Sequence, residues 1–100
     1  MSIEEYLTEK FKSFLNEKYE AFKEELSNER FCPNAEAIWK MYNEIYKQNQ
    51  GAYQFVKVLL GLDDYVGGHL NELNIALNET NRKCNDFCMA YVAALKKAGN

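Results

Sequence analysis

The sequence predicts an all-α protein, an antiparallel three-helix bundle of long helices. Three observations support this prediction: apolar residues recur at helical spacing in three separate stretches, the chain has one proline and five glycines, and the connections are short. So little glycine and proline argues against a β protein built from many turns. Three helices of similar length joined by short connections favour an up-down-up arrangement.

The stretch from His69 to Lys97 has the clearest helical pattern, and it contains neither proline nor glycine. The apolar stripe that runs along it has a mean spacing of about 3.6 residues, which is the period of a helix and not of a strand. Its members are Val66, Leu70, Leu73, Leu77, Thr80, Cys84, Phe87 and Tyr91. We therefore expect one face of this helix to anchor the core.

A first helix is expected from about Ile3 to Ser27, where Ser2 and Glu5 form a capping-box pattern at the start. Its apolar residues recur every 3.8 residues or so, about 0.2 more than a helical turn, so this stripe drifts around a straight helix in the right-handed sense. They are Ile3, Leu7, Phe11, Leu15, Tyr19, Phe22 and Leu26. This helix should cross its neighbours diagonally or change partners along its length.

A second helix is expected from about Pro33 to Leu60, and it carries two adjoining apolar lines. One line is Ile38, Met41, Ile45, Ala52, Phe55 and Leu59; the other is Trp39, Tyr42, Tyr46, Tyr53, Val56 and Leu60. Together they cover an arc of roughly 200°, which is wider than one neighbouring helix needs. The segment Gln48-Asn49-Gln50-Gly51 interrupts the pattern, so a break near Gly51, which would give four helices, is an alternative.

The composition indicates a folded single-domain protein and limits the kinds of partner that it can bind. Residues 1–100 form a single helical-bundle domain in this interpretation, with 47% hydrophobic and 27% charged residues and a net charge of −3. The chain has no run of basic residues to neutralise phosphates, so neither nucleic acid nor a membrane surface is expected as a partner. The odd number of cysteines, three, cannot form a full disulfide framework. We therefore expect a reducing, cytoplasmic location.

The residue types that most often act in catalysis or metal binding are not spaced so that they would form a site. Cys84 and Cys88 lie one turn apart on the apolar face, and Cys32 and His69 are the distant candidates for completing a metal site. Buried free thiols are the favoured interpretation, and His69 is interpreted as a surface or helix-cap residue. We expect no catalytic residue, metal or cofactor, and hence no enzyme.

Five asparagines form a ladder on the last helix, about 110° around it from the apolar stripe. They are Asn71, Asn74, Asn78, Asn81 and Asn85. Asparagine is a poor helix former. Each one lowers the stability of the helix by about 0.5 kcal/mol relative to alanine. The ladder is either a solvated face or a hydrogen-bonding face that docks a partner chain or polar ligand, with Ile75 and Met89 as apolar anchors.

An aromatic edge on the second helix is the other candidate surface. Its members are Trp39, Tyr42, Tyr46 and Tyr53. Tryptophan and tyrosine dominate binding hot spots because they bury a large area and keep a polar tip. The edge is either the second core face of a central helix or an interface.

These patterns favour a non-enzymatic protein–protein interaction module of adaptor or inhibitor type, for which a phage or mobile element is one source. It is expected to self-associate and to bind another protein through the aromatic edge or the asparagine ladder. One alternative is a bundle that binds a nucleotide or other small molecule between helices. A further alternative is a metal or thiol protein that uses Cys32, Cys84 and Cys88.

Overall fold

A computed structural model describes residues 2–27, 34–61 and 69–97, apart from the side chains of His69 and Leu70. It contains three α-helices: α1 (Ile3–Leu26), α2 (Ala35–Leu59) and α3 (His69–Lys97). They have 24, 25 and 29 residues, and no strand occurs in the described ranges. The predicted all-α class and the three long helices are therefore confirmed.

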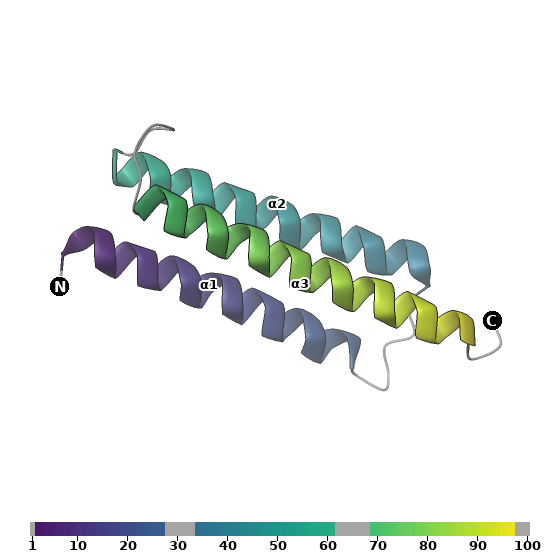
Figure 1. Ribbon diagram of the computed structural model, residues 1–100. Helices are drawn as coiled ribbons and strands as arrows, with labels where there is room; N and C mark the ends of the chain where they lie inside the picture. Colours follow the sequence, from purple (N-terminus) through teal and green to yellow (C-terminus); the bar gives the residue numbers. More distant parts are fainter. Residues whose placement is uncertain (1, 28–33, 62–68, 98–100) are drawn as a thin grey trace.

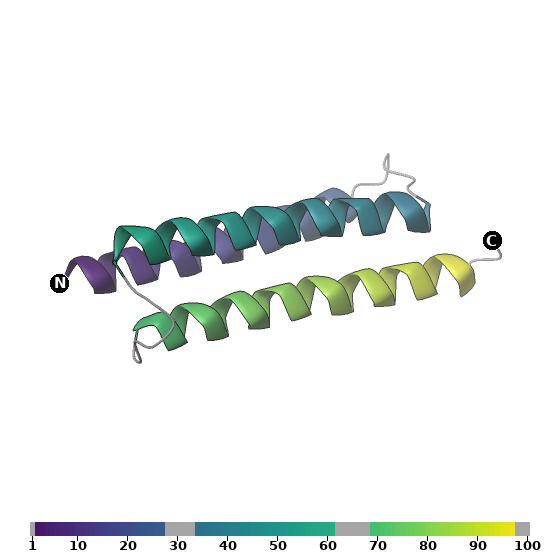
Figure 2. The ribbon, with the colours of Figure 1, turned by 90° about the horizontal axis from the view of Figure 1, so that it is seen from above.

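The helices pack side by side as an up-down-up bundle. Figure 1 shows α3 between α2 and α1, with α1 and α3 running in the same direction and α2 running the opposite way. In the turned view of Figure 2, α3 stands apart from α1 and α2, which overlap, so the three helices lie at the corners of a triangle. Most of the contacts between helices involve α3. The pairing of α1 with α2 is the least extensive.

Side-chain caps fix the starts of the first two helices. Glu5 N donates to Ser2 Oγ over 3.1 Å, as half of the predicted capping box. Ala37 N donates to Asn34 Oδ1 over 2.8 Å, so α2 begins two residues later than the sequence pattern suggested. An amide at this position satisfies a backbone N–H that would otherwise lack an intrahelical acceptor. Pro33, the predicted first residue of this helix, lies outside the described residues.

The second helix runs through Gly51 without interruption. The alternative of four helices is therefore wrong. The physical reason lies at Asn49, which looks like a break in an apolar pattern but is completely buried in the bundle. Asn49 is paired with Asn81 of α3, so packing against the bundle favours the helix at a position where local propensity does not.

The core consists of two apolar clusters, one in each half of the bundle. The first contains Phe11, Leu15, Val56, Leu73 and Leu77; the second contains Phe22, Leu26, Ile38, Cys84, Cys88 and Val92. Each cluster draws residues from all three helices. The predicted stripe of α3 is confirmed where its side chains are described, with Thr80, Phe87 and Tyr91 only partly buried.

The drifting stripe of α1 leaves the core at one end. Phe11, Leu15 and Phe22 are buried, whereas Ile3 is 68% exposed. A stripe with a period above 3.6 residues cannot keep facing one groove over six turns. Thr8 takes the buried position near the start of α1 instead.

The wide apolar arc of α2 is only partly used by the core. Ile38 and Val56 are buried along its middle. Tyr46 on one edge is 41% exposed, and Phe55 on the other edge is 66% exposed. The sequence pattern predicted an arc wider than one neighbouring helix needs, and the two neighbours present leave both of its edges partly exposed.

Candidate functional site

Three aromatic side chains form a row along one edge of α2. The ring centroids of Trp39 and Tyr42 are 5.7 Å apart and nearly perpendicular, and those of Tyr42 and Tyr46 are 6.1 Å apart. Both distances lie in the favourable range for edge-to-face and offset ring pairs. Trp39 and Tyr42 are half-buried, and Tyr46 is exposed. The row is therefore held in place by its own packing while part of its surface remains open.

Tyr42 locates this row at the boundary between α2 and α3. Burial raises the pKa of its phenol, and the neighbouring Cys84 and Cys88 thiols of α3 raise it further. Trp39 and Tyr42 also pack against the core cluster that contains these two cysteines. At the exposed end of the row, Gln50 Nε2 donates to Tyr46 Oη over 3.1 Å.

Tyr53, the fourth aromatic residue predicted for this edge, is placed differently. Its ring centroid lies 6.3 Å from that of Phe11 on α1, and it packs against the other core cluster. The predicted edge therefore divides into an outward-facing row of three and one residue that supports the core.

The asparagine ladder of α3 also divides. Asn71, Asn74 and Asn78 are exposed, and Asn85 is half-buried. Asn81 is only 7% exposed and accepts a hydrogen bond from Asn49 of α2. It is therefore a core residue of the bundle. Its spacing, four residues after Leu77 and three before Cys84, allows a buried position, and Asn49 on the opposite helix supplies the partner that makes burial favourable.

The remaining asparagines make only long hydrogen bonds within their own helix. Asn78 Nδ2 donates to Asn74 Oδ1 over 3.4 Å, and Asn85 Nδ2 lies 3.5 Å from Met89 Sδ. The first distance exceeds the usual range of about 2.7–3.2 Å for N–H···O hydrogen bonds, and in the second contact the acceptor is a thioether sulfur, which is a weak acceptor. These amides can therefore exchange their present contacts for a partner's groups at little cost.

The aromatic row and the asparagine ladder lie on the same side of the bundle. The Asn49–Asn81 contact fixes the register of two antiparallel helices, so positions after Asn81 on α3 lie level with positions before Asn49 on α2. Asn85 is accordingly level with Tyr46. We call this surface the α2–α3 face; it comprises Trp39, Tyr42 and Tyr46 of α2 with Asn74, Asn78 and Asn85 of α3.

The two described cysteines are buried in the core. Cys84 and Cys88 are free thiols with no exposed surface. Burial raises the pKa of each thiol to about 11, so both stay protonated at neutral pH, and a protonated thiol is a poor nucleophile and metal ligand. Cys32 and the side chain of His69 lie outside the described residues, among which no group of three potential ligands could hold a metal ion.

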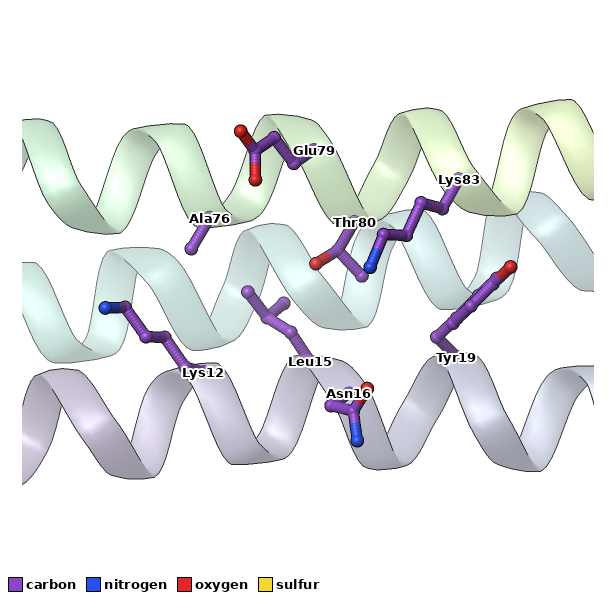
Figure 3. A pocket seen from close by; sticks show the side chains of 8 residues that line it. All are labelled: Lys12, Leu15, Asn16, Tyr19, Ala76, Glu79, Thr80 and Lys83. Carbon is purple, nitrogen blue, oxygen red and sulfur yellow. The ribbon is translucent and has the colours of Figure 1, made fainter.

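A shallow groove between α1 and α3, of about 220 Å³, was not foreseen from the sequence. Figure 3 shows its lining, in which Lys83 reaches from α3 toward α1. The Nζ atoms of Lys23 and Lys83 lie 4.5 Å and 5.6 Å from the ring centroid of Tyr19. Lys12 Nζ donates to Glu72 Oε1 over 2.7 Å, and this hydrogen bond raises the pKa of the lysine.

That groove offers little to a small ligand. Ligand pockets are usually enclosed spaces of about 300–1,000 Å³, whereas this groove is smaller and open. Its cations are held by acidic groups of the chain and by the ring of Tyr19. In the sequence, this groove is indicated only by two lysines, Lys12 and Lys83, that lie beside the apolar stripes of two different helices. Spacing within one helix does not show which residues of α1 and α3 lie side by side, so the groove could not be predicted.

No known protein family, curated protein or solved structure matches the chain. Within the described ranges, none of the three helices is both long enough and apolar enough to cross a lipid bilayer.

Proposed function

We propose that this chain is a non-enzymatic protein–protein interaction module that binds another protein through the α2–α3 face and also associates with itself. The observation that carries the proposal is the placement of the aromatic row beside the asparagine ladder. Both surfaces were predicted separately as binding surfaces, and the bundle brings them to one side. The adaptor or inhibitor role expected from the sequence belongs to this proposal.

The aromatic row supplies the apolar anchors. Ring contacts link Trp39 to Tyr42 and Tyr42 to Tyr46, so little rotamer freedom remains to be lost when a partner binds. Anchors that are already ordered give more affinity for the same buried area. Half-buried Trp39 and Tyr42 hold exposed Tyr46 in position, an arrangement typical of interface hot spots.

The asparagines supply uncharged polar contacts that continue the face from the exposed end of the row. Asn85 is level with Tyr46, and Asn78 and Asn74 lie level with positions of α2 that follow Asn49. An asparagine side chain offers two donors and one acceptor site with two lone pairs. A protein partner presents backbone and side-chain groups of both kinds, which such amides can match. The net charge of −3 gives nucleic acid no electrostatic advantage here, and a protein is therefore the favoured class of partner.

Quantitative affinity capture with three baits tests this proposal. The baits are the wild-type chain, a Tyr46→Ala/Asn78→Ala variant of the α2–α3 face, and a Gln54→Ala/Glu79→Ala control that changes exposed residues elsewhere on the same helices. We expect one or a few proteins to be enriched equally by wild type and control. Their recovery should fall about tenfold or more with the face variant, since one hot-spot residue contributes 2 kcal/mol or more.

The same set of proteins on all three baits would contradict the proposal. Circular dichroism of each bait provides the folding control. All four altered side chains are exposed, so the helical signal should not change.

A further inference from the structure

A second surface of the bundle lies between α1 and α2, on the side away from α3. A groove of about 280 Å³ runs along it. The apolar residues of its lining are Ala21, Phe22, Met41 and Ile45, and the polar residues are Lys18, Glu25, Glu44 and Gln48. We call this surface the outer α1–α2 face. The pairing of α1 with α2, which lies beneath the groove, is the least extensive of the three.

The apolar floor of this face extends beyond the groove toward the start of α1 and the end of α2. Leu7 and Phe14 precede Ala21 by about four and two turns, so these three residues lie along one side of α1. In the same way, Ala52 follows Ile45 by about two turns of α2. Five hydrophobic residues of this floor are partly buried and pack against the core clusters: Leu7, Phe14, Met41, Ile45 and Ala52. A strip of half-covered hydrophobic residues therefore follows the boundary between α1 and α2.

The strip ends in strongly exposed hydrophobic side chains. Ile3 precedes Leu7 by four residues, and Phe55 and Leu59 follow Ala52 by three and seven, so they continue the same sides of their helices. Ile3 is 68% exposed, Phe55 is 66% exposed and Leu59 is 55% exposed. Figures 1 and 2 both show the start of α1 and the end of α2 at the same end of the bundle. A contiguous group of exposed hydrophobic residues marks an interaction surface.

The shape of this surface fits one further helix. In a four-helix bundle, each helix packs against two neighbours and faces the remaining helix across a diagonal. Here α3 packs extensively against both α1 and α2, whereas α1 and α2 pack less against each other, as helices on a diagonal do. The corner opposite α3 lies over the outer α1–α2 face. From Leu7 to Glu25 the strip is about 27 Å long, the length of a helix of about 18 residues.

The favoured occupant of that corner is a helix of a different protein. Within residues 1–100, the longest stretch outside the three helices is residues 60–68, which is only about half of the length needed. In a second copy, every helix already packs its apolar stripe into its own core. Pressing two hollow faces together would also leave both grooves unfilled.

Charge beside the groove indicates what such a helix carries. Glu25 of α1 and Glu44 of α2 line the groove from opposite sides, and both are exposed. In the described ranges, neither carboxylate takes part in an ion pair. Lys18 lies about two turns before Glu25, and its Nζ is 5.5 Å from the ring centroid of Phe14. The part of the groove nearest the end of α1 is therefore acidic and attracts cations of a partner.

We propose that the outer α1–α2 face binds an amphipathic helix of a partner protein, which completes a four-helix bundle. The apolar stripe of that helix covers the strip that begins at Leu7 and ends at Met41. Lysine or arginine side chains at one end of the helix pair with Glu25 and Glu44. This site is separate from the α2–α3 face, so the chain can hold two partners at once, as an adaptor does.

Fluorescence anisotropy with three labelled synthetic peptides of about 18 residues tests the proposal. The first, the lysine peptide, has leucines at alternating spacings of three and four, a pair of lysines near one end, and alanine and glutamine elsewhere. In the glutamate peptide, glutamates replace the lysines. The scrambled peptide has the composition of the lysine peptide in an order without an apolar stripe.

Ala21→Lys and its matched control, Ala90→Lys, locate the contact. Both variants replace an exposed alanine within a helix, but only Ala21 lines the groove. We expect the wild type and Ala90→Lys to bind the lysine peptide equally, and to bind the scrambled peptide at least about tenfold more weakly. Ala21→Lys should bind the lysine peptide about tenfold more weakly than the wild type does, because it buries an unpaired ammonium group under the peptide.

Glu25→Lys/Glu44→Lys tests the charge of the partner. The wild type should bind the lysine peptide about tenfold more tightly than the glutamate peptide, and this preference should reverse in the variant because both contacts change sign. Glu79→Lys/Asp86→Lys makes the same change of net charge on exposed residues of α3 and should keep the preference of the wild type. Circular dichroism should show unchanged helix content in every variant, since all the replaced side chains are exposed.

Three results would overturn the inference. If the wild type binds the lysine peptide no more tightly than the scrambled peptide, the outer α1–α2 face does not bind an amphipathic helix. If Ala21→Lys binds as Ala90→Lys does, the peptide lies on another surface. If Glu25→Lys/Glu44→Lys keeps the preference of the wild type, these carboxylates do not pair with the partner. Capture through the α2–α3 face depends on other residues and would remain a separate result.

Discussion

Asn49 Nδ2 donates a hydrogen bond to Asn81 Oδ1 over 3.0 Å, inside the core. The pair joins α2 to α3 between the two apolar clusters, since Leu77 belongs to one cluster and Cys84 to the other. This hydrogen bond pairs the buried Nδ2 of Asn49, whereas its Oδ1 has no hydrogen-bond partner among the described residues. Leaving the donor unpaired as well would cost about 1–3 kcal/mol. Sliding α2 by one or two turns against α3 would set both amides against apolar side chains. The pair therefore favours a single register, as buried asparagines do in coiled coils.

Replacing one member of this pair should destabilise the protein more than replacing both. In Asn81→Leu, the amide of Asn49 stays fully buried and loses its partner, so we expect the free energy of unfolding to fall by about 1–3 kcal/mol. In Asn49→Leu/Asn81→Leu, both positions become apolar, and much of that loss should be recovered. Urea unfolding at one protein concentration measures the three values. A double variant less stable than Asn81→Leu would contradict this account of the pair.

Alanine should have opposite effects on stability at the two described glycines. Gly51 lies inside α2, and Gly61 follows its C-terminal cap. A Cβ at Gly51 would meet nothing within 4 Å. Gly51→Ala should therefore stabilise the protein by about 0.5–1 kcal/mol. Gly61 has a φ of +64°, so Gly61→Ala should destabilise it by about 1–2 kcal/mol.

Thermal unfolding followed by circular dichroism measures both effects. The Gly51 result also tests the continuity of α2, because alanine favours an unbroken helix and opposes a turn. A lower melting temperature for Gly51→Ala would contradict a helix that passes straight through this residue.

The buried thiols should make stability fall as pH rises above about 9. Burial raises the pKa of Cys84 and Cys88 from an ordinary value of 9.0 to about 11. Between these values the unfolded chain loses thiol protons that the folded chain keeps, so alkali favours unfolding. The raised pKa values of Lys12 and Tyr42 act in the same direction, since each group also holds its proton more tightly when folded.

A Cys84→Ala/Cys88→Ala variant separates the thiols from the other two groups. Its free energy of unfolding should be lower at pH 7, because two small cavities form in the core. Its decline between about pH 9 and 11 should nevertheless be shallower than that of the wild type. Equal slopes for the two proteins would show that the thiols do not ionise differently in the folded and unfolded chains.

Much of the fold could be predicted because it follows from local spacing. The stripe that includes Leu73, Leu77 and Cys84 repeats at the helical period, and α3 has the bounds that this repeat indicated. The ends of α1 and α2 differ from the predicted ends by one or two residues. The sequence also showed that one neighbour is not enough for α2, because an arc of about 200° is wider than one neighbouring helix needs. That both edges stay exposed beside two neighbours is seen only in the structure.

The placement of Asn81 could not be read from spacing alone. An asparagine at the edge of an apolar stripe suits either solvent or the core, and the choice depends on what the opposite helix presents. Here α2 presents Asn49. The meeting of Tyr46 and Asn85 on one face has the same origin, since it depends on the register between α2 and α3. Local sequence patterns fix the face of each helix but not the register between two helices.

Site-specific photo-crosslinking from the α2–α3 face tests the central claim most directly. A photoreactive phenylalanine analogue replaces Tyr46, which is 41% exposed, and in a control protein it replaces exposed Gln54 of the same helix. Irradiation in extract of the source cells should give a discrete adduct to a different protein from position 46 and none from position 54. If position 46 gives no adduct, or if both positions give the same adducts, the α2–α3 face is not the surface that binds a partner.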